Sequence, residues 1–182
     1  NDKVAYANER GIDFIICDHH LPGAELPDAV AVLDPKRKDC PYPYKELSGC
    51  GIGFKLAQGI AQRNGIALNE LEPLLDLVAV STACDIVPVT GENRVLTHFG
   101  LKWVNQATRP GFKVMMRMAN VKRVLGVSDL VFSIGPRINA AGRIEHGRQA
   151  VELLLAKDMA QAEHIGVRVD GNNTARQELD KD

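Results

Sequence analysis

The polar triplet Asp18-His19-His20 follows directly after a short apolar run and combines residue types that bind transition metals. Carboxylate oxygens and neutral imidazole nitrogens together suit manganese, iron or zinc better than calcium. Because neighbouring side chains of an extended segment point to opposite sides, we expect one histidine to bind metal and the other to face a substrate. The alternative is a polar turn with two solvated histidines.

A second candidate ligand, Asp85, directly follows the apolar segment 74–84. An ionised carboxylate is costly to bury unless a cation or hydrogen-bond donors replace its hydration. Taken alone, Asp85 fits an ordinary aspartate at a helix end or turn slightly better than a ligand. Taken together with the Asp18-His19-His20 triplet, it predicts a metal site.

A third group combines two guanidinium groups with an amide in a segment of small residues: Arg137, Asn139 and Arg143. The preceding Gly135-Pro136 predicts a break in regular structure, so we expect these residues on a loop. Side chains of this kind hold phosphate oxygens. A surface loop whose arginines pair with Glu145 or Asp129 fits the sequence equally well.

An alternation of helix and strand is expected to position the triplet. A helical segment that ends at Gly11 precedes an apolar, β-branched run over residues 12–17, which predicts a parallel strand buried on both faces. A second strand is predicted over residues 29–33, followed by a loop with three prolines over residues 34–48. Within that loop, the run Lys36-Arg37-Lys38 is expected to be solvated.

The remaining sequence is predicted to be mostly helical. Helices are predicted over residues 51–64, 93–106, 149–155 and 159–179, and a short one begins at Pro110. Residues 71–83 are apolar nearly all round, so periodicity cannot separate helix from strand there, but the length of the segment favours a buried helix. Ser128-Asp129 is predicted to cap a helix over residues 130–134. The expected fold class is therefore α/β, with a parallel sheet flanked by helices and a mostly helical second half.

Two of these helices carry further expectations. The glycine-rich segment 48–53 lacks the Gly-Lys-Ser/Thr of a P-loop, so it predicts a closely packed helix start more than an anion site. The helix over residues 93–106 is expected to bury an apolar stripe made of Val95, Leu96, Phe99, Trp103 and Val104.

The composition excludes several classes of protein. The 182 residues are 45% hydrophobic, 25% charged and 5% aromatic, with a net charge of −1, which is typical of a globular chain without a membrane span. The balanced charge gives no overall basic surplus, so binding of nucleic acid requires a local patch or metal ions. The cysteines form no C-x-x-C pair, which favours free thiols, a reducing compartment and a cytoplasmic location. They are Cys17, Cys40, Cys50 and Cys84.

Four segments together resemble the RecJ family of single-stranded-DNA-specific exonucleases, a branch of the DHH phosphoesterase superfamily. They are residues 15–23 (IICDHHLPG), 48–56 (SGCGIGFKL), 82–88 (TACDIVP) and 135–144 (GPRINAAGRI). The DHH triplet marks the superfamily, whereas the last block is specific to the RecJ branch. The similarity extends over essentially the whole chain.

The resemblance implies a two-metal phosphodiesterase that uses Mn²⁺ or Mg²⁺ to remove nucleotides from the 5′ end of single-stranded DNA. It implies that His19 and Asp85 bind metal, that Asp18 is a ligand or supports one, and that His20 contacts the scissile phosphate. These four are the implied catalytic residues. The implied partners are single-stranded DNA and proteins of DNA repair and recombination, with no membrane. The resemblance also implies that the block over residues 135–144 lies near the backbone of the DNA substrate. Its candidate phosphate-binding residues are Arg137, Asn139 and Arg143.

The sequence departs from the family pattern upstream of the triplet. The only aspartates before Asp18 are Asp2 and Asp13, and neither matches the two acidic motifs that the family has in this region. We therefore expect an internal fragment that is inactive alone. Residues 1–156 would form the C-terminal part of a DHH phosphoesterase domain, and residues 157–182 would begin a linker helix to a further domain.

Two other functions remain open. One is a different DHH phosphoesterase, such as an oligoribonuclease, a cyclic-dinucleotide hydrolase or a pyrophosphatase, which needs no groove for a long substrate. The other is a DNA-binding or replication scaffold without hydrolysis. The presence of Asp18, His19 and Asp85 argues against the scaffold, because a scaffold has no use for clustered ligands.

Overall fold

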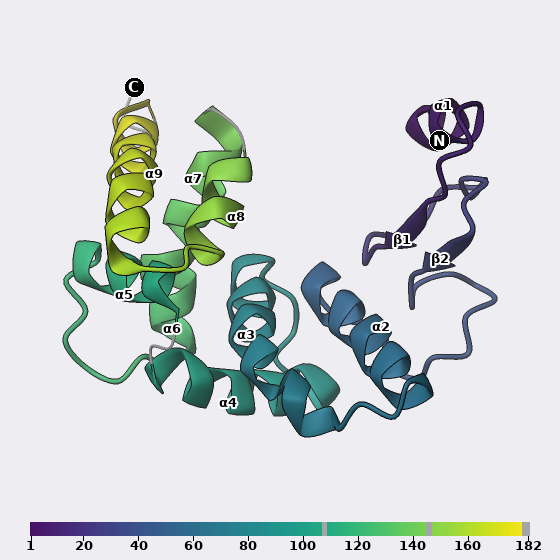
Figure 1. Cartoon of the computed structure of the whole chain (residues 1–182), viewed down its shortest axis with the longest axis horizontal. Helices are drawn as coiled ribbons and strands as arrows, with labels where there is room; N and C mark the ends of the chain where they lie inside the picture. The colour runs from purple at the N-terminus through teal and green to yellow at the C-terminus, as the bar shows by residue number, and fades with distance from the viewer. Residues whose placement is uncertain (107–108, 145–146, 180–182) are drawn as a thin grey trace.

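The computed structural model describes residues 1–106, 109–144 and 147–179, and it describes side chains over 1–106, 109–140 and 147–171. Figure 1 shows a curved arrangement of elements, with α1, β1 and β2 at one end and α5 to α9 at the other. Helices α2, α3 and α4 lie between these ends. The mostly helical second half and the α/β order of the first half are as predicted.

The first half of the chain alternates between helices and strands before it becomes helical. In chain order it contains α1 (Asp2–Asn8), β1 (Ile15–Cys17), β2 (Ala31–Leu33), α2 (Gly49–Arg63), a 3₁₀ segment (Leu68–Leu74), α3 (Leu75–Cys84) and α4 (Gly91–Gln106). The second half contains α5 (Pro110–Met118), α6 (Val127–Asp129), a wide π-type turn (Leu130–Ile134), α7 (Gly135–Ile144), α8 (Arg148–Leu154) and α9 (Met159–Leu179).

The two strands form a short parallel sheet in which Ile15 lies opposite Ala31 and Cys17 opposite Leu33. Both strands are shorter than predicted. The expectation that β1 is buried on both faces is wrong for the described residues, because the Ile15 side chain is 56% exposed and the neighbouring Val30 is 67% exposed. The parallel pairing is nevertheless as predicted, and it places Asp18 at the carboxyl end of β1.

The proline-containing loop over residues 34–48 is irregular, as predicted, but it is packed against the start of α4. The Tyr42 hydroxyl donates a hydrogen bond to Glu92 (2.7 Å), and the Tyr44 hydroxyl donates one to the Thr90 carbonyl oxygen (2.8 Å). The Asn93 amide donates to the Glu46 carbonyl oxygen (2.5 Å). These contacts fix the path by which the chain leaves β2 and enters α2.

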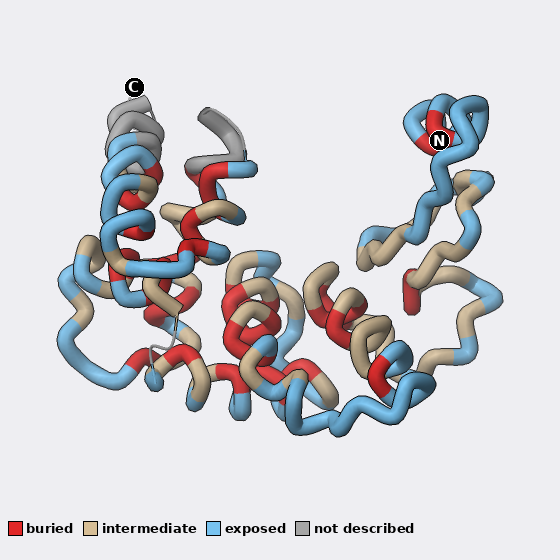
Figure 2. The backbone as a smooth tube through the Cα atoms, viewed as in Figure 1, coloured by how far each residue is buried: buried red, intermediate tan, exposed pale blue. Residues whose placement is uncertain are grey.

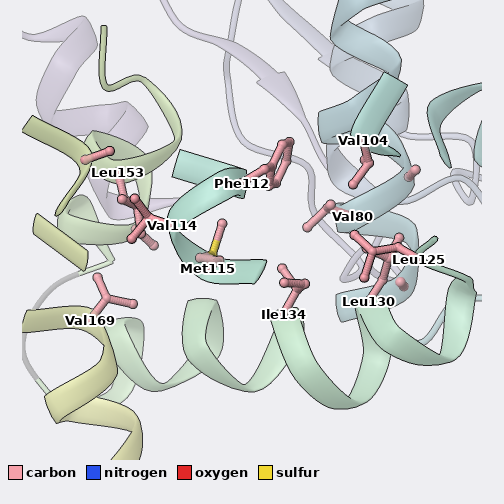
Figure 3. Close-up of a cluster of buried hydrophobic side chains, with 14 of the residues drawn as sticks. Val80, Val104, Phe112, Val114, Met115, Leu125, Leu130, Ile134, Leu153 and Val169 are labelled. Atoms are coloured by element: carbon pink, nitrogen blue, oxygen red, sulfur yellow. The ribbon is translucent and has the colours of Figure 1, made fainter. Parts of the chain in front are cut away.

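Two buried clusters hold the helices together, and Figure 2 shows that buried residues concentrate in α2 to α4 and in the helical second half. The smaller cluster joins α2, α3 and α4 through residues that include Leu47, Phe54 and Val78. The larger cluster extends from α3 to α9, and Figure 3 shows Phe112 and Met115 at its centre. Met115 is fully buried in this cluster, while Met116 and Met118 are partly buried against it.

The apolar stripe predicted for α4 is buried only in part. Leu96 and Val104 are buried and Trp103 packs against the smaller cluster, as predicted, whereas Val95 and Phe99 are 54% and 47% exposed. The polar residues Asn93 and Thr97 are buried in addition. The cause is the close crossing of α3 and α4: a Cβ at position 100 would lie 2.2 Å from the Leu75 carbonyl oxygen. Only glycine allows this approach, and the crossing determines which residues face inward.

Residues 127–144 follow one continuous helical path, so the prediction of a break at Gly135-Pro136 is wrong. Pro136 is the second residue of α7 and directly follows the wide π-type turn, so the proline lies at the junction of the two helical segments. The predicted cap is also corrected. Gly126 is the N-cap, and the Asp129 carboxylate accepts a hydrogen bond from its N–H (2.8 Å). Arg137, Asn139 and Arg143 therefore lie on a helix and not on a loop.

Helix α9 packs against α5, α7 and α8, and it contributes the buried residues Ala162 and Val169 to the larger cluster. The domain boundary after residue 156 stays a prediction. The first part of α9 nevertheless packs against the other helices of the second half. None of the described helices is both long enough and apolar enough to cross a membrane.

Candidate metal centre

The site forms where β1, α2 and α3 meet. The Asp18 N–H donates a hydrogen bond to the Leu33 carbonyl oxygen of β2 (3.0 Å), which extends the parallel pairing by one step. Ser48 caps α2, with its hydroxyl accepting from the Gly51 N–H (3.2 Å) and lying 3.5 Å from the Thr82 hydroxyl of α3. The predicted close-packed helix start at residues 48–53 is confirmed.

Asp18 organises the triplet. One oxygen, Oδ1, accepts hydrogen bonds from the His19 N–H (2.7 Å) and the His20 N–H (3.3 Å). The same oxygen lies 2.7 Å from Nδ1 of His20. The His20 hydrogen bond is the main cause that lowers the pKa of Asp18, and the two backbone hydrogen bonds add to it. Asp18 is therefore ionised at neutral pH, and Nδ1 of His20 donates to it.

The His19 ring lies beside the His20 ring, with their centroids 4.5 Å apart, so the expectation that the two side chains point to opposite sides is wrong. The Nε2 atom of His19 faces α3 and lies 3.8 Å from Oδ2 of Asp85, and the His19 side chain is largely buried against the first turn of α2. This distance is too long for a direct hydrogen bond. Two atoms that each bind one small divalent cation at about 2.1 Å are at most about 4.2 Å apart. His19 and Asp85 therefore fit two ligands of a single ion.

Asp85 is held at the C-terminal end of α3. Its N–H donates to the Ser81 carbonyl oxygen (2.9 Å), and the Ser81 hydroxyl donates to Oδ2 (3.3 Å). Ile86 follows with φ of 54°, a left-handed conformation that ends helices and is costly for a β-branched residue. The chain therefore turns sharply after Asp85, which leaves the carboxylate at the helix end beside His19.

The donor chemistry fits a transition-metal centre. Asp18, His19 and His20 each offer one ligand atom, and these atoms lie within 4.8 Å of one another. Asp85 joins this set through His19. Mixed carboxylate and imidazole donors suit Mn²⁺, as the sequence predicts. The structure thus brings together all four residues that were expected to be catalytic.

A pocket of about 340 Å³ lies beside Asp85 and is lined by residues of α2, α3, α7 and α8, among them Cys50, Ser81 and Asn139. Asn139 and Asp85 therefore line the same pocket, and the substrate contact of Asn139 stays a prediction. In an α-helix a separation of two residues is a rotation of about 200°, so Arg137 and Asn139 point to opposite sides of α7.

Arg137 faces α9 and not this pocket. Its guanidinium group donates to Asp170 (2.9 Å), to the Ser133 carbonyl oxygen (2.7 Å) and to the Met118 carbonyl oxygen (3.3 Å). In this structure Arg137 joins α7 to α9, and its predicted phosphate contact stays a prediction. The side chain of Arg143 lies outside the described residues.

Sequence reasoning missed the supporting residues of the site. Ser81 precedes Asp85 by four residues, which is the spacing of neighbours on one helix face, so its hydrogen bond to Asp85 was detectable in the sequence. The contact of the His19 ring with the first turn of α2 at Gly49 had no local signal.

Two cysteines at the pocket are expected to react slowly. Burial raises the pKa of Cys50 to about 11 and that of Cys84 to about 12. Because only the thiolate is nucleophilic, alkylation of both should be slow at pH 7.5 and should accelerate about tenfold per pH unit as the pH rises. Mass spectrometry of iodoacetamide-treated protein measures these rates, and rapid labelling of the folded chain at neutral pH would contradict the burial argument. The same chain in urea is the positive control.

Residues 1–82 match the sequence model of the DHH family, N-terminal domain. The single-stranded-DNA-specific exonuclease RecJ of Bacillus subtilis is 41% identical over 97% of this chain and 22% of its own length. RecJ of Escherichia coli is 39% identical over 98% of this chain and 33% of its own length. The chain thus spans about a third or less of the length of these relatives.

Solved structures show the same similarity. A crystal structure of exonuclease RecJ bound to manganese has a TM-score of 0.87 and 29% identity, over 99% of this chain and 45% of the other. RecJ from Thermus thermophilus in complex with Mn²⁺ has a TM-score of 0.86 and 29% identity, over 100% of this chain and 27% of the other. A Mg²⁺ complex from the same organism has a TM-score of 0.79. Nearly the whole chain is therefore similar in sequence and fold to one part of the RecJ exonucleases, and residues 1–82 match the DHH family.

Proposed function

We propose that this chain is part of a metal-dependent exonuclease that hydrolyses single-stranded DNA from its 5′ end by a two-metal mechanism. The observation that carries the proposal is the 3.8 Å approach of His19 to Asp85, beside the Asp18–His20 pair. These residues come from separate elements, so the fold itself assembles the donor set. The names of the RecJ relatives support single-stranded DNA as the substrate class, and the 5′ direction rests on the family resemblance of the sequence motifs.

His19 and Asp85 would hold a Mn²⁺ or Mg²⁺ ion, with Asp18 as a further ligand or as the support of His20. When bound, such an ion neutralises developing charge on phosphate oxygens and lowers the pKa of water. Asp18 keeps the proton of neutral His20 on Nδ1, which leaves Nε2 as an acceptor. If the ring is protonated, Nε2 carries a proton that it can donate to a phosphate oxygen. His20 is highly exposed and accessible to a substrate.

Asn139 would orient the substrate. It lines the pocket next to Asp85, and its amide can donate to a phosphate oxygen or accept from a sugar hydroxyl. Arg143 lies four residues further along α7, and it remains a candidate phosphate contact. Arg137 would act on the substrate only if it left its three partners on α5, α9 and the preceding turn.

The donor set is too small for a complete two-metal centre. Asp18, His19, His20 and Asp85 provide at most four protein side chains, and two ions need more unless water fills most positions. We therefore propose that residues 1–182 bind metal weakly and do not turn over substrate alone. The acidic ligands that complete the centre would come from a longer protein, because this chain covers only a third or less of the length of its RecJ relatives.

The cellular setting is part of the same proposal. The four cysteines are free, which agrees with a reducing compartment, and we propose the cytoplasm. The partners would be single-stranded DNA and proteins of DNA repair and recombination. The linker role of residues 157–182 is also proposed, with α9 anchored to the helical core at its first half.

The test uses a longer protein that carries these residues together with the regions present in its relatives. We expect Mn²⁺-dependent release of mononucleotides from the 5′ end of labelled single-stranded DNA, and its loss in His19→Ala. Activity confined to dinucleotides or pyrophosphate would indicate a different phosphoesterase. DNA binding without any hydrolysis would indicate a scaffold. Robust Mn²⁺-dependent turnover by residues 1–182 alone would overturn the proposed need for further ligands.

A further inference from the structure

Helix α4 exposes an apolar strip on the side that does not pack against α3. Val95 and Phe99 are about half exposed and lie one helical turn apart. The close crossing at Gly100 turns this strip outward. Exposed apolar residues that gather on one helix face are typical of interaction sites, whereas scattered ones are not.

The strip borders a groove of about 610 Å³, which we call the α4 groove. Its apolar walls come from α4, from the loop before it and from the start of α6, and they consist of Val89, Val95, Phe99, Leu101 and Val127. None of its lining residues belongs to the candidate metal centre or to the pocket at Asp85. The α4 groove is therefore a separate surface feature.

A row of basic side chains follows the same face of α4. Arg94, His98 and Lys102 are each one turn apart, which corresponds to about 6 Å along the axis. Among the described residues, no carboxylate lies within ion-pair distance of any of the three. The Lys102 ammonium instead lies 4.7 Å from the centre of the Phe99 ring. Arg94 and Lys102 therefore have unmatched positive charge beside an apolar groove.

The chemistry of the groove favours a peptide over a nucleic acid. Its walls are mainly aliphatic, which suits leucine-like side chains better than bases. The Phe99 ring already contacts Lys102 and, edge-on, His98 at 5.2 Å, so it is a poor platform for base stacking. The spacing of the basic row matches carboxylates that repeat every helical turn.

We propose that the α4 groove docks an acidic amphipathic helix of a partner protein. The apolar face of that helix enters between Val95, Phe99 and Val127, and its flanking carboxylates pair with Arg94, His98 and Lys102. Helix-in-groove recognition of this kind combines apolar anchors with charge complementarity.

The probe is a synthetic helical peptide of about 18 residues with leucines on one face and glutamates beside them. Binding is followed by anisotropy of the labelled peptide and by the fluorescence of Trp103, the single tryptophan, which lies one turn after Phe99 on α4. We expect micromolar binding to residues 1–182. A peptide of the same composition with scrambled leucine positions, and one with lysines in place of glutamates, should bind at least about tenfold more weakly.

Matched variants locate the contact. The double variant Arg94→Glu/Lys102→Glu and the variant Val95→Ser should each weaken peptide binding about tenfold or more without changing the circular dichroism spectrum. Lys113→Glu, on the separate basic surface of α5, should leave binding unchanged. Equal binding of the scrambled or lysine peptide, or insensitivity to the α4 variants, would overturn the proposal. Displacement of the peptide by oligothymidylate, with the same variants affected, would assign the groove to nucleic acid instead.

Discussion

Asp85→Asn in the longer protein is expected to lower Mn²⁺-dependent hydrolysis of single-stranded DNA by about 10³-fold. Asparagine keeps the shape of the side chain, but it removes the negative charge that faces His19 across 3.8 Å. A metal ion supplies several kcal/mol of charge stabilisation, and about 4 kcal/mol corresponds to a factor of 10³. We expect kcat to fall and the Mn²⁺ concentration needed for the half-maximal rate to rise.

Ser81→Ala is the matched comparison for Asp85→Asn. It removes only the hydrogen bond to Oδ2 of Asp85 and leaves the carboxylate in place. Residues that support a metal ligand typically account for a factor of 10 to 100, so we expect a loss of about tenfold. Retention of more than a tenth of the activity in Asp85→Asn would show that Asp85 is no ligand.

Asp76→Ala should destabilise the fold by about 3–5 kcal/mol, which corresponds to a fall in Tm of roughly 10 °C. The Asp76 side chain is 1% exposed, and Oδ2 accepts a hydrogen bond from Nε of Arg109 at 2.6 Å. Burial is the main cause that raises the pKa of Asp76, and the Arg109 hydrogen bond opposes this rise. Removing Asp76 leaves the partly buried guanidinium group without its counter-charge, between α3 and the start of α5.

Urea unfolding followed by circular dichroism measures this effect. Glu152→Ala, which removes the exposed pair with Arg148, is the matched control and should cost no more than about 0.5 kcal/mol. The double variant Asp76→Leu/Arg109→Leu should be more stable than Asp76→Ala, because neither charge is left unpaired. If the double variant is equally unstable, the loss comes from packing and not from the ion pair.

Much of the local structure was predictable from the sequence, because it depends on near neighbours. Periodicity, segment length and the position of Pro110 located α2, α3, α5, α8 and α9 to within a few residues. The polar triplet directly after an apolar run predicted a site at a strand end, and Asp18 indeed follows β1. The backbone hydrogen bonds of Asp18 to His19 and His20 are local and need no tertiary context.

The errors occurred where tertiary packing overrides local preference. Gly135-Pro136 has the composition of a break, but the helical path continues through it, with Gly135 close against Cys84. Val95 and Phe99 of α4 were expected to be buried, yet they are about half exposed, and the backbone contact at Gly100 directs Asn93 and Thr97 inward. Neither outcome follows from hydrophobic periodicity, because both depend on how closely α3 approaches another helix.

The amino-acid sequence specifies which donor groups are present for a metal centre, and it places the first of them directly after a strand. The contact of His19 with Asp85, which lies far along the chain, depends on how β1, α2 and α3 pack, and so does the position of Asn139 in the same pocket while Arg137 turns to α9. Residue types and spacing specify ligand chemistry and local geometry. The distance between two groups on different elements depends on the packing of those elements, which no local pattern encodes.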